Sequence, residues 1–203
     1  MLLCIPIIKA YNFFMNKLKF ILLLLLFAGC TGVTNKDKPL KDMKAVKIKN
    51  QYQINVPNYL TPSETMLSPD ASLMYSNKDR EFYLMIIDEM KSDKTENGEQ
   101  LQLKDYFQRS TDNIAGGLTE SKNSQPENIN LNGLKCIRMT VGGKYNLFTM
   151  IYKCYIAESS THFYQIYCWT ISDLLSQNEI DMNRTLSSFR ELPSAGDKIE
   201  ITQ

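Results

Sequence analysis

The chain has 203 residues, a formal net charge of +1 at pH 7 and 43% hydrophobic residues. This length suits one domain with a real hydrophobic core, and the near-neutral charge gives no electrostatic reason to expect a nucleic-acid partner. The five cysteines are too few for a fold that depends on a disulfide framework.

The first element of the chain is a short apolar run between a basic segment and a cysteine. It consists of Lys17 and Lys19, the run Phe20–Phe27, and Ala28-Gly29-Cys30. This order is that of a secretory signal peptide, and the cysteine after the small residues makes it a bacterial lipoprotein signal. The run is far shorter than the roughly 20 apolar residues of a membrane-spanning helix. We therefore predict that residues 1–29 are a signal peptide and that Cys30 is acylated.

Acylation at Cys30 predicts a protein tethered to a membrane. Met15 is the expected true initiator, and removal of the signal takes three lysines with it, which changes the formal charge from +1 to −2. Two or three acyl chains, palmitate among them, hold a protein stably on a bilayer. Thr31 stands where an aspartate often marks inner-membrane retention, so we favour the outer membrane of a bacterial envelope. Residues 30–50 are expected to be a solvated basic tether, whose lysines suit anionic headgroups.

The folded domain is expected over residues 51–191, followed by a polar tail at 192–203. Alternation of apolar and polar residues predicts strands, and apolar residues at helical spacing predict a helix. The expected elements of the first half are a strand at 52–56 ended by Pro57, a loop at 58–70, strands at 72–76 and 81–90 joined at Asn77-Lys78-Asp79, a helix at 102–115 ended by Gly116-Gly117, and a short strand at 120–124.

The second half of the domain is expected to be an antiparallel meander followed by a helix. Its strands are predicted at 134–142, 145–157 and 161–170, with Gly142-Gly143 as the first turn. The meander concentrates the aromatic residues, and both of its faces are apolar, so the sheet should be covered on both sides. Ser176–Glu179 has the pattern of a capping box, and a buried helical stripe follows at Met182, Leu186 and Phe189.

Together these elements predict an α+β fold, an α/β/α sandwich with a central antiparallel sheet of about six strands flanked by helices. The opening Tyr52–Pro57, the turn into Leu131–Leu134 and the closing helix that ends on Ser188-Phe189-Arg190 resemble PsbP-like (Mog-type) domains. The resemblance covers about residues 50–191 and implies the same sandwich. Members of that family include an extrinsic subunit of photosystem II, a nuclear-transport GTPase-binding factor and bacterial lipoproteins. They have scaffolding and binding roles in common more than any catalytic activity. No functional residue carries over.

Residues that could carry chemistry are sparse. His162 is the one histidine, and no serine or aspartate stands in a recognisable triad pattern with it, so a polar residue at a strand edge is the preferred interpretation. Cys136, Cys154 and Cys168 could form a zinc site with His162, but their spacing lacks close pairs. Buried free thiols are preferred, and whether any of the three pair stays open.

An acidic cluster near a loop is the last candidate. Its members are Asp88, Glu89, Asp93, Glu96 and Glu99. They lack the alternating spacing of a calcium loop, so a solvated loop is the preferred interpretation. We expect no catalytic residue, no metal and no cofactor.

The leading functional hypothesis is a membrane-anchored envelope lipoprotein. It would act as a non-catalytic binding or accessory module through contacts with an envelope protein. The alternative is a carrier or sensor that holds a lipid or small molecule in an apolar cavity between sheet and helix, lined by the meander aromatics. A hydrolase that uses His162 is a third hypothesis and the least favoured.

Overall fold

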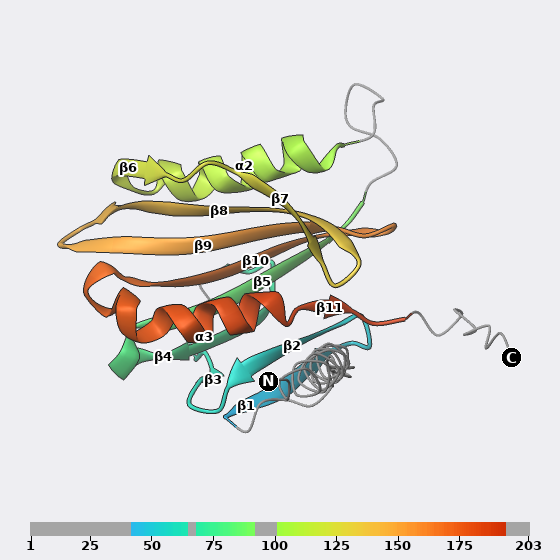
Figure 1. Cartoon of the computed structure of the whole chain (residues 1–203), viewed down its shortest axis with the longest axis horizontal. Helices are drawn as coiled ribbons and strands as arrows, with labels where there is room; N and C mark the ends of the chain where they lie inside the picture. Colours follow the sequence, from blue (N-terminus) through green and yellow to red (C-terminus); the bar gives the residue numbers. More distant parts are fainter. Residues whose placement is uncertain (1–41, 65–67, 92–100, 194–203) are drawn as a thin grey trace, which may run out of the picture. The chain divides into compact units, whose positions relative to one another are not determined.

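The structure, a computed structural model, describes residues 42–64, 68–91 and 101–193. These residues form an antiparallel α+β fold with two α-helices (Figure 1), which confirms the predicted fold class. The strands are β1 (Met43–Ile48), β2 (Tyr52–Pro57), β3 (Thr61–Pro62), β4 (Ala71–Asn77), β5 (Phe82–Met90), β6 (Thr119–Asn123), β7 (Glu127–Leu131), β8 (Leu134–Tyr145), β9 (Phe148–Glu158), β10 (His162–Ile171) and β11 (Arg190–Glu191). The helices are α2 (Leu103–Gly116) and α3 (Leu175–Ser187), with 3-10 turns at Lys78–Arg80 and Ser172–Leu174.

The larger sheet has eight strands, so the expected number of about six is wrong. Its order is β3-β4-β5-β10-β9-β8-β6, and β7 also pairs with β8. The two strands that the sequence pattern did not reveal are β3, which has two exposed residues, and β7, which is exposed over most of its length. Backbone pairing rather than hydrophobic periodicity makes these segments strands, and pairing leaves no mark in the apolar pattern.

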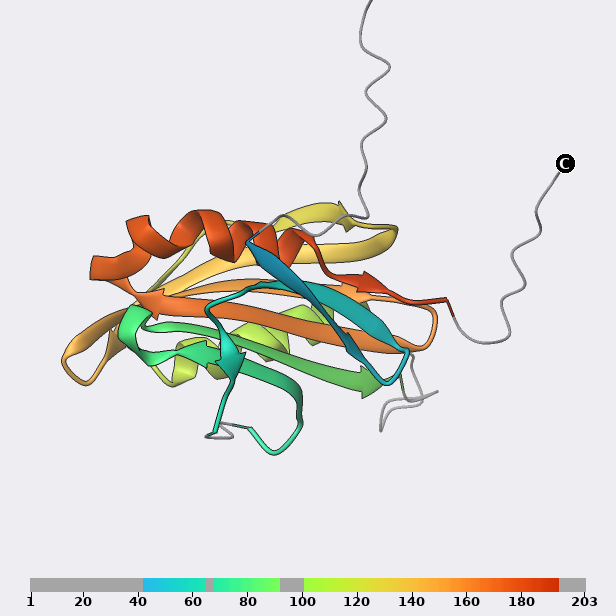
Figure 2. The same ribbon diagram turned by 90° about the horizontal axis from the view of Figure 1, so that it is seen from below.

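The two faces of the larger sheet carry separate hydrophobic cores. Side chains alternate between the faces along a strand, and neighbouring residues of β10 belong to different cores. Ile166 lies in one core with Met182 of α3, and Tyr167 lies in the other with Phe107 of α2. We call these the α3 core and the α2 core. Figures 1 and 2 show the two helices on opposite sides of the sheet.

A second sheet of three strands, β1-β2-β11, adds to the α3 core. It corrects two expectations: β2 is not a strand of the central sheet, and residues 30–50 are not a tether throughout, because β1 pairs with β2 along its whole length. The lysines of β1 obscure the alternation of inward and outward side chains that would identify a strand in the sequence. Val46 and Ile48 are half-buried against the α3 core, whereas Lys47 between them is exposed.

Gly142-Gly143 is not the turn that the sequence predicts. Both glycines lie within β8 and are in register with β9. The turn follows at Asn146-Leu147, where Asn146 has a φ of +53°. Glycine is needed at position 143 for space, because a Cβ there would lie 2.8 Å from the Cβ of Leu118.

Helix α2 and the first hairpin form where they were predicted, but α3 begins differently. It starts at Leu175 without a side-chain capping hydrogen bond, so the predicted capping box at Ser176–Glu179 does not form. Asn178 is instead fully buried. Its Nδ2 donates to the carbonyl oxygen of Arg80 at 2.8 Å and to Thr170 Oγ1 at 2.9 Å. Asn178 thus ties the start of α3 to β10 and to the 3-10 turn before β5, while its Oδ1 has no hydrogen-bond partner in the described part of the chain. The capping pattern is out of register, because the 3-10 turn at Ser172–Leu174 continues directly into α3 and Ser176 does not stand at a helix start.

Candidate functional site

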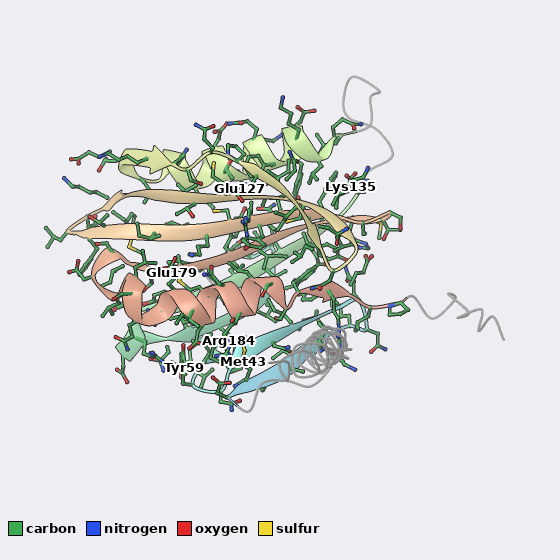
Figure 3. The ribbon with its side chains drawn as sticks, in the orientation of Figure 1. Met43, Tyr59, Glu127, Lys135, Glu179 and Arg184 are labelled. Atoms are coloured by element: carbon green, nitrogen blue, oxygen red, sulfur yellow. The ribbon has the colours of Figure 1, made fainter. Side chains whose placement is uncertain are left out.

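An uncovered strip of the larger sheet lies beside α3. The helix packs mainly against β10 and β2, so β8 and β9 leave part of the same face open. The resulting groove has a volume of about 550 Å³. We call it the β8–β9 groove, and it is lined by Ser124, Glu127, Arg138, Met139, Thr140, Lys153, Tyr155, Asn183, Arg184 and Ser187. Glu127 of β7 and Arg184 of α3, both labelled in Figure 3, belong to its opposite walls.

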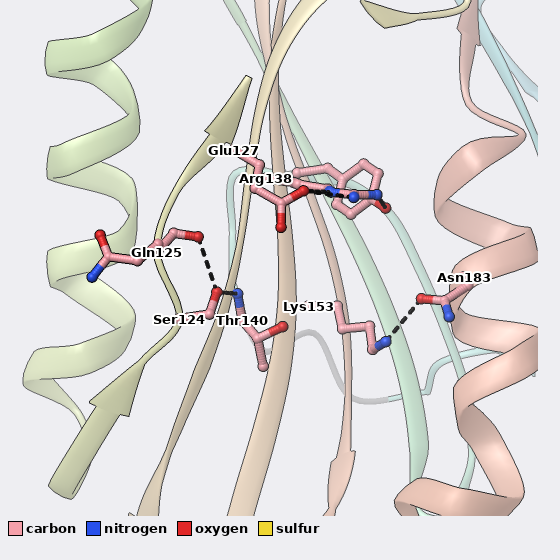
Figure 4. Close-up of polar contacts among 8 residues, drawn as sticks. Ser124, Gln125, Glu127, Arg138, Thr140, Lys153 and Asn183 are labelled. Atoms are coloured by element: carbon pink, nitrogen blue, oxygen red, sulfur yellow. Dashed lines mark hydrogen bonds and ion pairs between the residues drawn. The ribbon is translucent and has the colours of Figure 1, made fainter. Parts of the chain in front are cut away.

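One polar row crosses the floor of the groove. Arg138 is in register with Glu127 of β7 on one side and with Tyr155 of β9 on the other. Its Nη2 and Nε donate to Glu127 Oε2 at 2.6 and 2.9 Å, and its Nη1 donates to Tyr155 Oη at 3.3 Å (Figure 4). The two charged side chains are 43% and 59% exposed, so solvent limits the ion pair to about 0–1 kcal/mol. The row therefore orients the guanidinium more than it stabilises the fold.

A second polar row lies closer to the β8–β9 turn. Thr140 is in register with Lys153, and the Thr140 amide donates to Ser124 Oγ at 3.0 Å. Lys153 Nζ donates to Glu179 Oε1 and to Asn183 Oδ1, each at 2.8 Å, and Figure 4 shows the second of these bonds. The Lys153 side chain is only 14% exposed. This lysine thus ties the floor of the groove to its α3 wall.

The charges at the groove are balanced within the domain. Arg138 and Lys153 each have a carboxylate partner, and Arg184 bonds to Asp42 and Asp181 at 3.0 and 3.3 Å. A small anion would have to displace these partners, which disfavours a simple phosphate or carboxylate site. The lining contains neither histidine nor cysteine, the side chains most used as a general base and as a thiolate nucleophile. An arginine on an open surface is instead typical of protein interfaces.

His162 lies at the other end of the strands, at the start of β10. Its Nδ1 is 2.8 Å from Thr161 Oγ1, and its ring stacks on Tyr164 with the centroids 5.9 Å apart. The nearby Ser159 hydroxyl accepts from the backbone amide of His162, not from the ring. Among the described residues no carboxylate bonds to the imidazole. His162 lies at the end of a strand, as expected, but β10 is an inner strand of the larger sheet between β5 and β9.

The three cysteines of the folded domain are free and buried. Cys154 is in register with Tyr167 and belongs to the α2 core, whereas Cys136 and Cys168 belong to the α3 core. A bridge between Cys154 and Cys168, or a zinc site that uses all three thiols, would have to pass through the sheet. Burial raises the pKa of Cys136 to about 12, which keeps this thiol protonated and unreactive. Within the described ranges, no group of three metal-ligating side chains comes together.

The meander aromatics divide between core and surface. Most are buried in the two cores: Tyr155, Phe163, Tyr164, Tyr167 and Trp169. They fill the space in which a carrier would hold its ligand. Tyr145 and Phe148, by contrast, are 57% and 56% exposed, and Leu147 between them is 96% exposed.

Several predicted positions lie outside the described residues. They are Cys30 with its signal and the first part of the tether, the acidic residues Asp93, Glu96 and Glu99, and the tail from residue 194. In the part of the chain that is described, neither helix has the length and apolar character needed to span a bilayer.

Sequence reasoning did not single out the groove. A signal was present, because Arg138, Thr140 and Lys153 interrupt an otherwise apolar meander on one face. The meander was interpreted as apolar on both faces, and only the register shows that these three residues share a strip. The Glu127 wall belongs to β7, which the sequence pattern did not predict.

Comparison with known proteins shows a likeness in structure but not in sequence. No protein-family model and no curated protein matches the chain. Cyanobacterial PsbP (CyanoP) from Synechocystis sp. PCC 6803 is similar with a TM-score of 0.54 and 16% identity, over 80% of this chain and 97% of that one. LpqN, involved in cell envelope biogenesis of Mycobacterium tuberculosis, is similar with a TM-score of 0.50 and 12% identity, over 70% and 83% of the two chains. At these identities the likeness concerns the fold, and it supports the PsbP-like architecture that the sequence resemblance implies.

Proposed function

We propose that this protein is a lipid-anchored accessory module of a bacterial cell envelope, which binds a protein partner in the β8–β9 groove. Cys30 carries the lipid, and the outer membrane is favoured over the inner. The module acts by binding and not by catalysis. This proposal joins the lipoprotein signal at residues 1–30 to a domain with a polar groove beside α3.

The envelope location has support from one structural neighbour. LpqN is described as involved in cell envelope biogenesis, and it shares the fold of this domain. A fold can host unrelated functions, so the stronger support comes from the signal peptide pattern itself.

The observation that carries the binding proposal is the construction of the groove floor. Arg138 is held by Glu127 and Tyr155, and Lys153 is held by Glu179 and Asn183. Side chains fixed before binding lose little conformational entropy when a partner arrives. A preorganised arginine on an open strip is one of the residues that dominate binding energy in protein interfaces. The buried Tyr155 beside it helps to hold the guanidinium in place.

The lipid anchor is tested by metabolic labelling with an alkyne analogue of palmitate. The wild-type protein should incorporate the analogue, and the Cys30→Ala variant should not. Persistent label on Cys30→Ala would overturn the assignment of the acylated residue.

The binding surface is tested by charge reversal with a matched control on the same strand. Arg138→Glu places a carboxylate against Glu127 and should abolish partner recovery from membranes solubilised in mild detergent. Lys135→Glu is the control, because Lys135 is an exposed cation of β8 whose side chain lies on the opposite face. Equal recovery with both variants, at equal amounts of folded protein, would exclude the groove as the binding surface.

A further inference from the structure

The turn between β8 and β9 concentrates exposed apolar side chains. We call residues 145–148 the hairpin tip. Of the five large hydrophobic side chains that are exposed among the described residues, Tyr145, Leu147 and Phe148 belong to this tip. Leu147 is 96% exposed, so it contributes no burial to the domain. Turn positions are normally filled by polar residues or glycine, and nothing within the fold accounts for a leucine here.

The hairpin tip stands beyond the neighbouring strand. The last pair between β10 and β9 joins Ile171 to Met150, so Phe148 and Thr149 have no partner in β10. Figure 1 shows the β8–β9 turn as a projection at one end of the larger sheet. The tip itself carries no acidic residue. The adjacent Lys144 is paired with Glu120 at 2.6 Å.

We propose that the hairpin tip is a membrane-contact site, with Leu147 inserted into the interfacial region of the bilayer and the rings of Tyr145 and Phe148 beside it. The proposal rests on the lipid anchor at Cys30. Leucine and aromatic side chains are those that proteins place at the boundary between headgroups and acyl chains.

The length of the tether makes this contact possible. Residues 31–41 join Cys30 to Asp42, where the described chain begins, and an extended chain of that length reaches at most about 40 Å. The 12 residues of β8, at about 3.4 Å each, span a similar distance. A tether as long as the sheet allows the tip to reach the surface to which Cys30 is fixed.

The described part of the chain also begins near the end of the larger sheet that carries the hairpin tip. The carbonyl oxygen of Asp42 accepts from the amide of Asn58, and Tyr59 lies against Phe82 with the ring centroids 6.3 Å apart. Phe82 is the first residue of β5, at the same end of the larger sheet as the hairpin tip. Once the anchor confines the domain to the surface, a weak second contact is enough to fix its orientation, because the effective concentration is high.

The test places a polarity-sensitive, lipid-quenchable dye on one cysteine of the anchored protein. Leu147→Cys labels the tip. Ser160→Cys is the matched control, because Ser160 is an exposed turn residue at the opposite end of β9. The other thiols of the folded domain are buried and should not react. The labelled lipoproteins are reconstituted into phosphatidylcholine–phosphatidylglycerol vesicles that carry a nitroxide at the interfacial depth of the lipid.

The expected result is loss of most of the Leu147→Cys fluorescence to the nitroxide and almost none of the Ser160→Cys fluorescence. Equal quenching of the two labels, while the protein still floats with the vesicles, would overturn the tip contact and leave the anchor standing. A blue-shifted Leu147→Cys label that the lipid nitroxide does not quench would show burial against protein, which also overturns the proposal. Labelling of the wild-type protein by the dye, or its failure to float with the vesicles, would show that Cys30 is not acylated. Either result would overturn both the lipid anchor and the tip contact.

Discussion

Replacing Gly143 by alanine should destabilise the domain, whereas replacing Gly142 should not. A Cβ at position 143 would lie 2.8 Å from Leu118 Cβ and 3.1 Å from the carbonyl oxygen of Thr119. Neither atom can swing away, because one is bonded to the backbone and the other belongs to it. At position 142 the tightest contact is 3.3 Å to the Cδ1 methyl of Ile151, which can rotate.

The magnitude follows from two opposing effects. Alanine is favoured over glycine within a strand by about 0.5–1 kcal/mol, and this gain is common to both variants. Overpacking that moves the backbone costs about 1–3 kcal/mol, and it applies to position 143 alone. The free energy of unfolding of Gly143→Ala should therefore fall about 1–3 kcal/mol below that of Gly142→Ala.

The assay is urea unfolding of the two variants and the wild type, followed by circular dichroism. A difference of 1 kcal/mol corresponds to about 2–4 °C in Tm for a domain of this size, so a thermal melt provides an independent check. A Gly143→Ala protein as stable as Gly142→Ala would refute the placement of both glycines inside β8. It would favour the turn at Gly142-Gly143 that the sequence predicts.

Two further predictions concern the core and the effect of pH. Met182→Ala should lower the free energy of unfolding by about 2–5 kcal/mol, because Met182 is fully buried, whereas Ile180→Ala, at 69% exposed, should change it little in the same urea assay; equal effects would show that α3 is rotated. Burial raises the pKa of Tyr83 from 10.0 and that of Cys136 from 9.0, each to about 12. Both groups hold their protons more tightly when folded, so the stability they contribute is fully present below about pH 9 and is lost as the pH rises towards 12. The urea midpoint should therefore fall steadily above pH 9, and a midpoint that rose over this range would contradict the burial of these groups.

The sequence predicts those elements whose apolar period matches their burial. Helix α2 and the strands of the meander follow this rule, as does the stripe of Met182 and Leu186 in α3. β1 was not predicted, because lysines surround Val46 and Ile48 and a basic run after a lipoprotein signal is more often a linker. β7 was not predicted, because its side chains are mostly exposed and only its backbone pairing defines it as a strand.

Local motifs failed where tertiary contacts competed with them. Ser176–Glu179 has a capping pattern, but the 3-10 turn at Ser172–Leu174 runs directly into α3, so Ser176 does not stand at the start of the helix. Asn178 and Glu179 bond instead to Thr170 and Lys153 of the sheet. A glycine pair between two strands is typical of a turn, yet here Leu118, distant in sequence, sets the requirement for glycine at 143.

The candidate site was the least predictable feature. Glu127, Arg138, Lys153 and Asn183 are spread over more than fifty residues, and only strand register and the position of α3 bring them together. No local spacing encodes such an arrangement, in contrast to the signal at Cys30, which is contiguous in the sequence.

Photo-crosslinking in intact cells tests the central claim most directly. A photoreactive phenylalanine in place of Ser187, an exposed residue at the edge of the groove, should give a discrete adduct with an envelope protein, and Arg138→Glu should abolish that adduct. The same probe in place of Asn113, an exposed residue of α2, should give none. Absence of an adduct at Ser187, or identical adducts at both positions, would contradict the account of the groove as the binding surface.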